Sequence, residues 1–160
     1  MAVDMFMQLD GIKGESKDDK YAESIDVLAW SWGVSNSGSA HMGTGQGTGK
    51  ANFQDISFTK YVDKSTADLM FACSSGKHVA KAKLICRKAG TDPLDYLTFN
   101  FTDILVSSIS TGGGKGEERL TENVTLNFGT VQMEYWTQSK TGAKDKNALF
   151  GWDIPTNKKL

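Results

Sequence analysis

The stretch Asn123-Val-Thr-Leu-Asn-Phe-Gly-Thr-Val-Gln-Met-Glu-Tyr-Trp136 alternates apolar and polar residues, which predicts one long β-strand. The alternation changes phase partway along, because the apolar positions are Val124, Leu126 and Phe128, and then Val131, Met133 and Tyr135. One extra residue near Gly129 accounts for this change and is typical of a β-bulge. Long strands that change phase are typical of strongly curved sheets and small barrels.

A second long strand, earlier in the chain, shows the same kind of phase change. Its apolar positions shift near Asp103, from Leu97, Phe99 and Phe101 to Ile104 and Val106. The glycine-rich segment Ser110–Gly116 predicts a flexible turn that joins the two long strands in antiparallel order. We therefore predict a mainly β fold, built as a small curved antiparallel β-barrel.

One segment breaks the period of two. Ser65-Thr-Ala-Asp68 resembles a capping box in which Asp replaces the more usual Glu, and Gly76 provides a stop signal. The residues between them place an apolar set on one helical face, namely Leu69, Met70, Ala72 and Cys73. The pattern predicts one short α-helix at about 65–75 that covers an open end or face of the barrel.

The segment Ile25–Val34 predicts a strand with two different faces. One face carries bulky side chains and is expected to lie in the core, namely Leu28, Trp30, Trp32 and Val34. The other face is small, which suits solvent or a close neighbour, and consists of Val27, Ala29, Ser31 and Gly33. The charged segment Gly14–Glu23 that precedes this strand is predicted to be a solvated loop.

A long polar excursion, Ser35–Lys50, separates this strand from the next one at Ala51–Tyr61. Its glycines leave it little side-chain surface to bury and a large conformational entropy to lose on ordering. We predict a long extended loop at about 35–50. A segment of this kind in a compact fold usually binds something or stays disordered.

Composition limits the possible functions. The chain has 160 residues and a formal net charge of −1, which predicts a single domain over 1–160 and gives no basic surface for nucleic acid. No apolar window is long enough to insert in a membrane, and the first residues do not resemble a signal peptide. Cys73 and Cys86 are expected to act as buried small apolar residues in a reducing compartment.

Motifs for chemistry fail on spacing or context. Thr44–Ala51 superficially resembles a phosphate-binding loop, but its first glycine is displaced, Ala51 replaces the hydroxyl, and a strand follows instead of a helix. His41 and His78 form no metal-ligand spacing with the two cysteines. No activated nucleophile is recognisable. We therefore expect no catalytic residue, no cofactor and no metal.

Several blocks of the chain resemble the Hcp family, the haemolysin co-regulated proteins of type VI secretion. The blocks occur in order and span nearly the whole chain: Met1–Met7, Gly14–Ser16, Ile25–Gly33, Phe58–His78, Val106–Ser108 and Arg119–Phe128. The resemblance implies a β-barrel with one flanking helix that assembles into hexameric rings. It implies further that the rings stack into a tube inside a contractile sheath, with a spike at the tip, and carry effector proteins.

The resemblance also implies roles for the loop and the small-residue face. We expect the loop to contact another subunit or ring through Ser37, Gly38, His41, Met42, Gly43, Gly45, Gly47 and Gly49. Ser31 and Ala29 are candidates to face the lumen of the ring. The implied route is assembly in the cytoplasm followed by secretion without a signal peptide.

Two alternatives to a tube subunit remain open at this stage. A ring-shaped carrier or chaperone of effectors would share the fold. A stand-alone ligand-binding barrel, for example one that binds carbohydrate, is a further alternative.

Overall fold

The computed structural model describes residues 2–38 and 49–160. Its elements are the helix α1 (Ser65–Ser75) and the strands β1 (Val3–Leu9), β2 (Ile25–Ser31), β3 (Val34–Ser35), β4 (Asn52–Phe53), β5 (Ile56–Tyr61), β6 (His78–Lys88), β7 (Leu94–Thr111), β8 (Thr121–Asn127), β9 (Thr130–Gln138), β10 (Lys144–Asp153) and β11 (Lys158–Lys159).

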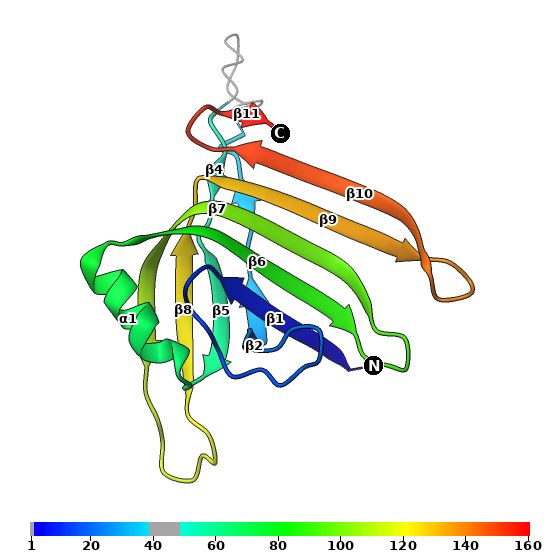
Figure 1. The fold of residues 1–160 in the computed structure, drawn as a ribbon. Coiled ribbons are helices and arrows are strands. Elements are labelled where there is room, and N and C mark those ends of the chain that lie inside the picture. Colours follow the sequence, from blue (N-terminus) through cyan, green and yellow to red (C-terminus); the bar gives the residue numbers. More distant parts are fainter. Residues whose placement is uncertain (1, 39–48) are drawn as a thin grey trace.

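The main sheet closes on itself. Its strand order is β11-β10-β9-β7-β6-β1-β2-β5-β8, and β7 also pairs with β8. Six strands from β7 to β8 therefore form a closed antiparallel barrel, which confirms the predicted fold class. Strands β9 and β10 continue the sheet beyond β7 as a wing (Figure 1).

Both predicted phase changes are present, and they lie opposite each other. Strands β8 and β9 run in the same direction along β7, where Asn127 pairs with Leu105 and Thr130 pairs with Thr102. The predicted single strand is thus two strands, separated at 128–129. On β7 the phase change coincides with Asp103, whose φ of 55° is left-handed.

The barrel interior is filled with apolar side chains from every strand of the barrel. The two halves of β7 both contribute, as their phase change predicts: Phe99 and Phe101 before Asp103, and Ile104 and Val106 after it, are all buried. Cys86 is buried as predicted, whereas Cys73 is only half-buried against the core. Full burial of each large apolar side chain stabilises the fold by about 1.5–3 kcal/mol.

The prediction of which side chains of Ile25–Val34 point into the core is only partly correct. Trp30 and Trp32 do pack against the core, but Leu28 and Val34 are exposed and Val27 is buried. The cause is a further bulge, because the register between β2 and β5 shifts between Val27 and Ala29. The extra residue reverses the inward face of the strand after Val27.

Helix α1 has the predicted bounds, and it buries Leu69 and Ala72 while packing against β7. Gly76 ends it in a left-handed conformation, with φ of 69°. The predicted capping box is wrong. Ser65 is the first helical residue, and both its N–H and its hydroxyl donate to Oδ1 of Asp63, at 2.8 and 2.5 Å.

The segment Gly14–Glu23 is a loop, but the prediction that it is solvated is wrong in part. Ser16 and Tyr21 are buried. Tyr21 packs with Phe6 and Ile85 in a small second cluster on the outside of the barrel. An exposed-looking charged segment is therefore attached to the barrel through an aromatic ring.

Candidate functional site

Four neighbouring strands of the barrel, β2, β5, β8 and β7, carry an outward face without charged side chains across two cross-strand rows. One row is Ser31, Ser57, Thr125 and Ser108, and the other is Ala29, Thr59, Asn123 and Ser110. Directly paired residues of antiparallel strands share a face, so each row forms a continuous band. We call these two rows the uncharged face.

Hydrogen bonds between side chains fix this face. The hydroxyl of Thr59 donates to Oδ1 of Asn123 at 2.7 Å, and the hydroxyls of Ser108 and Thr125 lie 2.6 Å apart. At one end Asp55 accepts bonds from Ser107 and Asn127, at 2.6 and 3.0 Å. Because both Asp55 oxygens accept hydrogen bonds, the carboxylate attaches the turn that precedes β5 to the two strands β7 and β8.

The uncharged face includes residues that the sequence analysis did not single out. Their signal was present, because Ser57 and Thr59 alternate with buried Ile56 and Phe58 on β5. Of the two candidates for the lumen, Ser31 and Ala29, both are exposed on this face. The structure thus brings the two candidates together with small hydroxyl and amide side chains from three further strands.

The four-strand sheet has two edges without a strand partner in the described part of the chain. On β2, the side away from β5 pairs with β1 only at Ile25 and Asp26, which leaves 27–31 open. On β7, the side away from β8 pairs with β6 only as far as Leu105, which leaves 106–111 open. Open backbone edges are suited to pairing with another chain.

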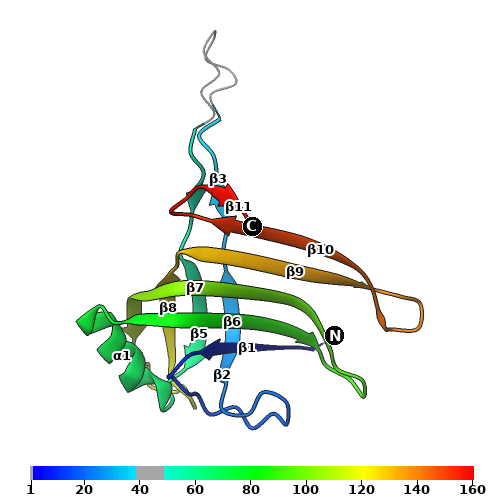
Figure 2. The ribbon, with the colours of Figure 1, turned by 45° about the horizontal axis from the view of Figure 1, so that its top comes forward.

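The predicted contact loop begins and ends on a short stem, formed by β3 and β4. Val34 pairs with Phe53 and Ser35 pairs with Asn52. Figure 2 shows that this stem rises beside β11, at the end of the molecule where the chain terminates. Beyond the stem, the side-chain amide of Asn36 donates to the carbonyl of Gly49 at 2.7 Å.

Three of the predicted loop residues can be placed. Ser37 and Gly38 are exposed at the stem, and Gly49 faces Ser37 so closely that a Cβ on Gly49 would lie 2.1 Å from its hydroxyl. A side chain at 49 would require the Ser37 hydroxyl to move, so glycine favours the close approach of the two sides of the stem. The other predicted contact residues, His41, Met42, Gly43, Gly45 and Gly47, lie outside the described residues.

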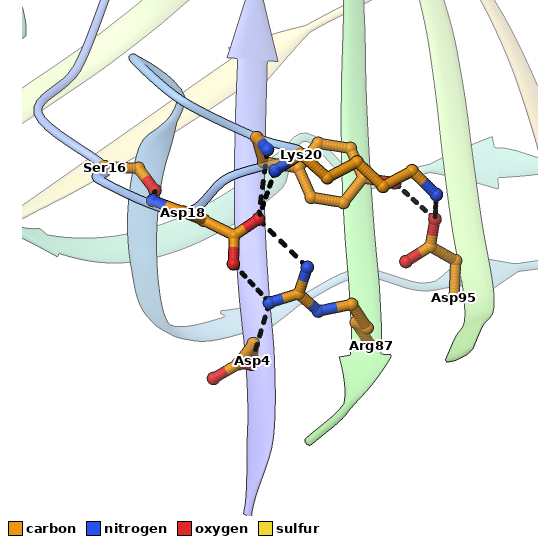
Figure 3. Close-up of polar contacts among 7 residues, drawn as sticks. Asp4, Ser16, Asp18, Lys20, Arg87 and Asp95 are labelled. Atoms are coloured by element: carbon orange, nitrogen blue, oxygen red, sulfur yellow. Dashed lines mark hydrogen bonds and ion pairs between the residues drawn. The ribbon is translucent and has the colours of Figure 1, made fainter. Parts of the chain in front are cut away.

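A charged cluster connects strands β1 and β6 with the loop 14–23 (Figure 3). The nearly buried guanidinium of Arg87, on β6, donates to Asp18 at 2.6 and 3.0 Å and to Asp4 at 3.1 Å. The hydrogen bonds from Arg87 lower the pKa of Asp18 from 3.8 to about 2. Arg87 also lies over the ring of Tyr21, at 5.7 Å. The cluster ties the loop 14–23 to the barrel, which is a structural role.

A second charged cluster is buried under the start of α1. The ammonium of Lys60 pairs with the carboxylates of Glu122 and Asp63, and the hydroxyl of Thr66 donates to Glu122 at 2.7 Å. Lys60 and Glu122 are 0% and 1% exposed. This cluster joins the first turn of α1 to β5 and β8.

No three His, Cys, Asp or Glu side chains are placed to hold a metal ion within 2–38 and 49–160. In the same residues, no helix has the length and apolar character needed to cross a membrane. His78, an early metal candidate, is exposed and lies 2.8 Å from Asp103.

Comparisons with known proteins agree with one another. The model of a family described as "Type VI secretion system effector, Hcp" matches residues 6–135. The curated protein hcp1 of Pseudomonas aeruginosa is 60% identical over 159 residues, covering 98% of each chain. The structure of Hcp1 from Salmonella typhimurium is 37% identical, with a TM-score of 0.82 over 100% of both chains. A structure described as a type six secretion system protein is 31% identical, with a TM-score of 0.92 over 99% of this chain and 100% of that chain.

Proposed function

This chain belongs to the Hcp family of type VI secretion, in which it is a tube subunit, and we propose that its barrels join into a six-membered ring through the edges of the sheet β2-β5-β8-β7. The observation that carries this proposal is the pair of open strand edges, 27–31 on β2 and 106–111 on β7. They lie on opposite sides of one sheet. Joining the first edge of one copy to the second edge of the next makes a heterologous contact, and such contacts form a ring when the rotation closes.

The uncharged face is proposed to line the pore of this ring. Ser31 and Ala29 lie on it, with serine, threonine and asparagine side chains from the neighbouring strands. Small side chains keep a channel wide, and hydroxyl and amide groups keep it hydrated. A cargo protein would be held there by many weak hydrogen bonds, because the two rows offer no charged side chain for an ion pair.

The loop 35–50 is proposed to contact a neighbouring subunit or ring. The position of its stem supports this, because β3 and β4 lie at the end of the barrel beside β11 (Figure 2). A polar, glycine-rich segment gains order only where another surface meets its backbone. The contact would act together with the pairing of strand edges, and ring assembly would depend on both.

A deletion tests the role of the loop. Removal of Ser37–Gly47 is expected to leave a folded barrel that no longer forms rings, since the deletion leaves the barrel strands and the core intact. Far-ultraviolet circular dichroism reports the fold, and multi-angle light scattering reports the mass of the assembly. Removal of Gly112–Gly116, in the turn between β7 and β8, is the control and should retain the ring. Hexamers of the Ser37–Gly47 deletion would show that the loop is not an assembly contact.

The wider partners of the ring follow from the family. We infer that the rings stack into a tube inside a contractile sheath behind a spike, and that the protein assembles in the cytoplasm before export through this machine. An export assay tests the route: the protein should disappear from the culture supernatant, but not from cells, when the sheath gene is deleted. Unchanged export without the sheath would contradict it.

A carrier of effectors is the second candidate, and it is compatible with the ring. The uncharged face favours it, because its hydroxyl and amide side chains can form hydrogen bonds with a cargo protein. A stand-alone ligand-binding barrel has less support, since apolar side chains fill the interior of the barrel. We likewise propose no enzymatic activity, in keeping with a family of structural secreted proteins.

A further inference from the structure

The stem of the contact loop is too short to hold its own direction. Strands β3 and β4 share only the pairs Val34–Phe53 and Ser35–Asn52. An isolated pair of strands is at best marginally stable in water, even when it is longer than this. The direction of the stem must therefore be set by its contacts with the rest of the molecule.

Two hydrogen bonds attach the stem to the end of β2. The indole N–H of Trp32 donates to the carbonyl of Gln54 at 2.8 Å, and the N–H of Gln54 donates to the carbonyl of Gly33 at 3.0 Å. These bonds fix the distance between the two sides of the stem. Both bonds involve the backbone of Gln54, so they attach the stem at one residue and by themselves leave it free to tilt.

An aromatic stack prevents this tilt. The ring of Phe53, on β4, packs against both Trp32 and Trp152, with centroid separations of 6.3 Å and interplanar angles of 22° and 29°. Trp32 continues into the core through Phe128, at 6.2 Å. Trp152 comes from the far end of the chain, on β10.

Trp152 is itself held firmly. It pairs with Val131 of β9 and with Lys159 of β11. Two residues later, the N–H of Ile154 donates to the carbonyl of Gly129 at 3.0 Å. The Phe53 ring therefore contacts the wing of the sheet through Trp152 and the barrel core through Trp32.

We propose that Trp152 is a positioning residue for ring assembly, acting through Phe53 to set the direction of the loop stem. The proposal rests on the proposed function, because it assigns a role within subunit association. Fixing a binding segment in its bound direction reduces the entropy lost on association. Loss of the Trp152 ring should therefore weaken association even though the strand edges and the loop are unchanged.

The test compares Trp152→Leu with Phe101→Leu, a core substitution in a ring that lies 6.1 Å from Phe99 and 4.6 Å from Phe128. Both variants should lower the melting temperature. Only Trp152→Leu should weaken subunit association, by about tenfold or more in mass photometry over a dilution series. It should also speed hydrogen exchange at the Gln54 amide. Trp152→Phe, which keeps an aromatic side chain at this position, should recover both the strength of association and the slow hydrogen exchange at Gln54.

A double substitution separates positioning from general destabilisation. If Trp152 acts through Phe53, the variant Phe53→Leu/Trp152→Leu should associate no more weakly than Phe53→Leu alone. The proposal would be overturned if the losses in association strength from Phe53→Leu and Trp152→Leu were additive in the double variant. It would also be overturned if Trp152→Leu associated as strongly as Phe101→Leu. Failure of the wild-type chain to form rings would contradict the proposed function instead. In that case the exchange rate at Gln54 in Trp152→Leu still decides whether Trp152 holds the stem.

Discussion

Gly129, between β8 and β9, lies directly against Asp103 in the middle of β7. The N–H of Gly129 points at the carbonyls of both Thr102 and Asp103, at 2.9 and 3.2 Å. A Cβ on Gly129 would lie 3.2 Å from the Cβ of Asp103, which itself has a φ of 55°. The two irregularities therefore form one joint, and they let β7 pair with β9 on one half and with β8 on the other.

Gly129→Ala is expected to destabilise the fold by about 1–3 kcal/mol, because the added methyl group overpacks against Asp103. Gly112→Ala is the matched control, since nothing lies within 4 Å of a Cβ there. Urea unfolding at one fixed protein concentration measures both. Equal midpoints for the two variants would show that the close approach at 129 carries no strain.

This joint was predictable because its signal is local. The apolar positions around Gly129 and Asp103 change phase within the sequence itself, and the structure has both changes. The bulge near Leu28 was not predictable in the same way. Leu28, Trp30 and Trp32 alternate without interruption. Only the register with β5 shows that Leu28 points outward.

The charged clusters were missed for a related reason. Charge alone predicts exposure, so the sequence places Asp18 in a solvated loop. It gives no signal for the burial of Lys60. Their partners, Arg87 and Glu122, lie far away in sequence and meet them only in the folded barrel. The proposed roles of the loop and of Ser31 are of another kind. They depend on a second copy of the chain, so they remain predictions.

The ion pair between Asp18 and Arg87 predicts a loss of stability in acid. The folded-state pKa of Asp18 is about 2, below its ordinary value of 3.8. The unfolded state therefore binds more protons between these values, and the contribution of Asp18 is present above about pH 4 and lost as the pH falls toward 2. The free energies of unfolding of the wild type and Asp18→Asn, measured in urea, should differ at pH 5 and become equal near pH 2. A difference that is independent of pH would contradict this assignment.

Removal of only one partner of the buried ion pair Lys60–Glu122 should strongly lower the stability of the fold. Glu122→Ala leaves the Lys60 ammonium short of a partner in the core, at a cost of about 3–5 kcal/mol. The double variant Lys60→Met/Glu122→Leu removes both charges and should recover most of that loss. Glu117→Ala, in the exposed turn, is the control. A double variant that is less stable than Glu122→Ala would show that the unpaired charge is not the cause of the loss.

Ser31→Gln is expected to impair cargo retention without disrupting the ring. A longer side chain would occupy the pore where the row Ser31, Ser57, Thr125 and Ser108 now presents small hydroxyl groups. Co-purification of effector proteins measures retention, and light scattering checks the ring. Lys115→Gln, in the exposed turn after β7, controls for the substituted side chain. Unchanged capture of every cargo by Ser31→Gln would argue against a pore-lining position.

A cryo-electron microscopy reconstruction of the purified assembly tests the central proposal most directly, because it shows both the ring and the orientation of each barrel. We predict six-fold rings in which the open edge of β2 lies beside the open edge of β7 of the next subunit, with Ser31 and Asn123 facing the pore. A ring with these two side chains on its outer wall would contradict the proposed assembly, and so would a protein that remains monomeric.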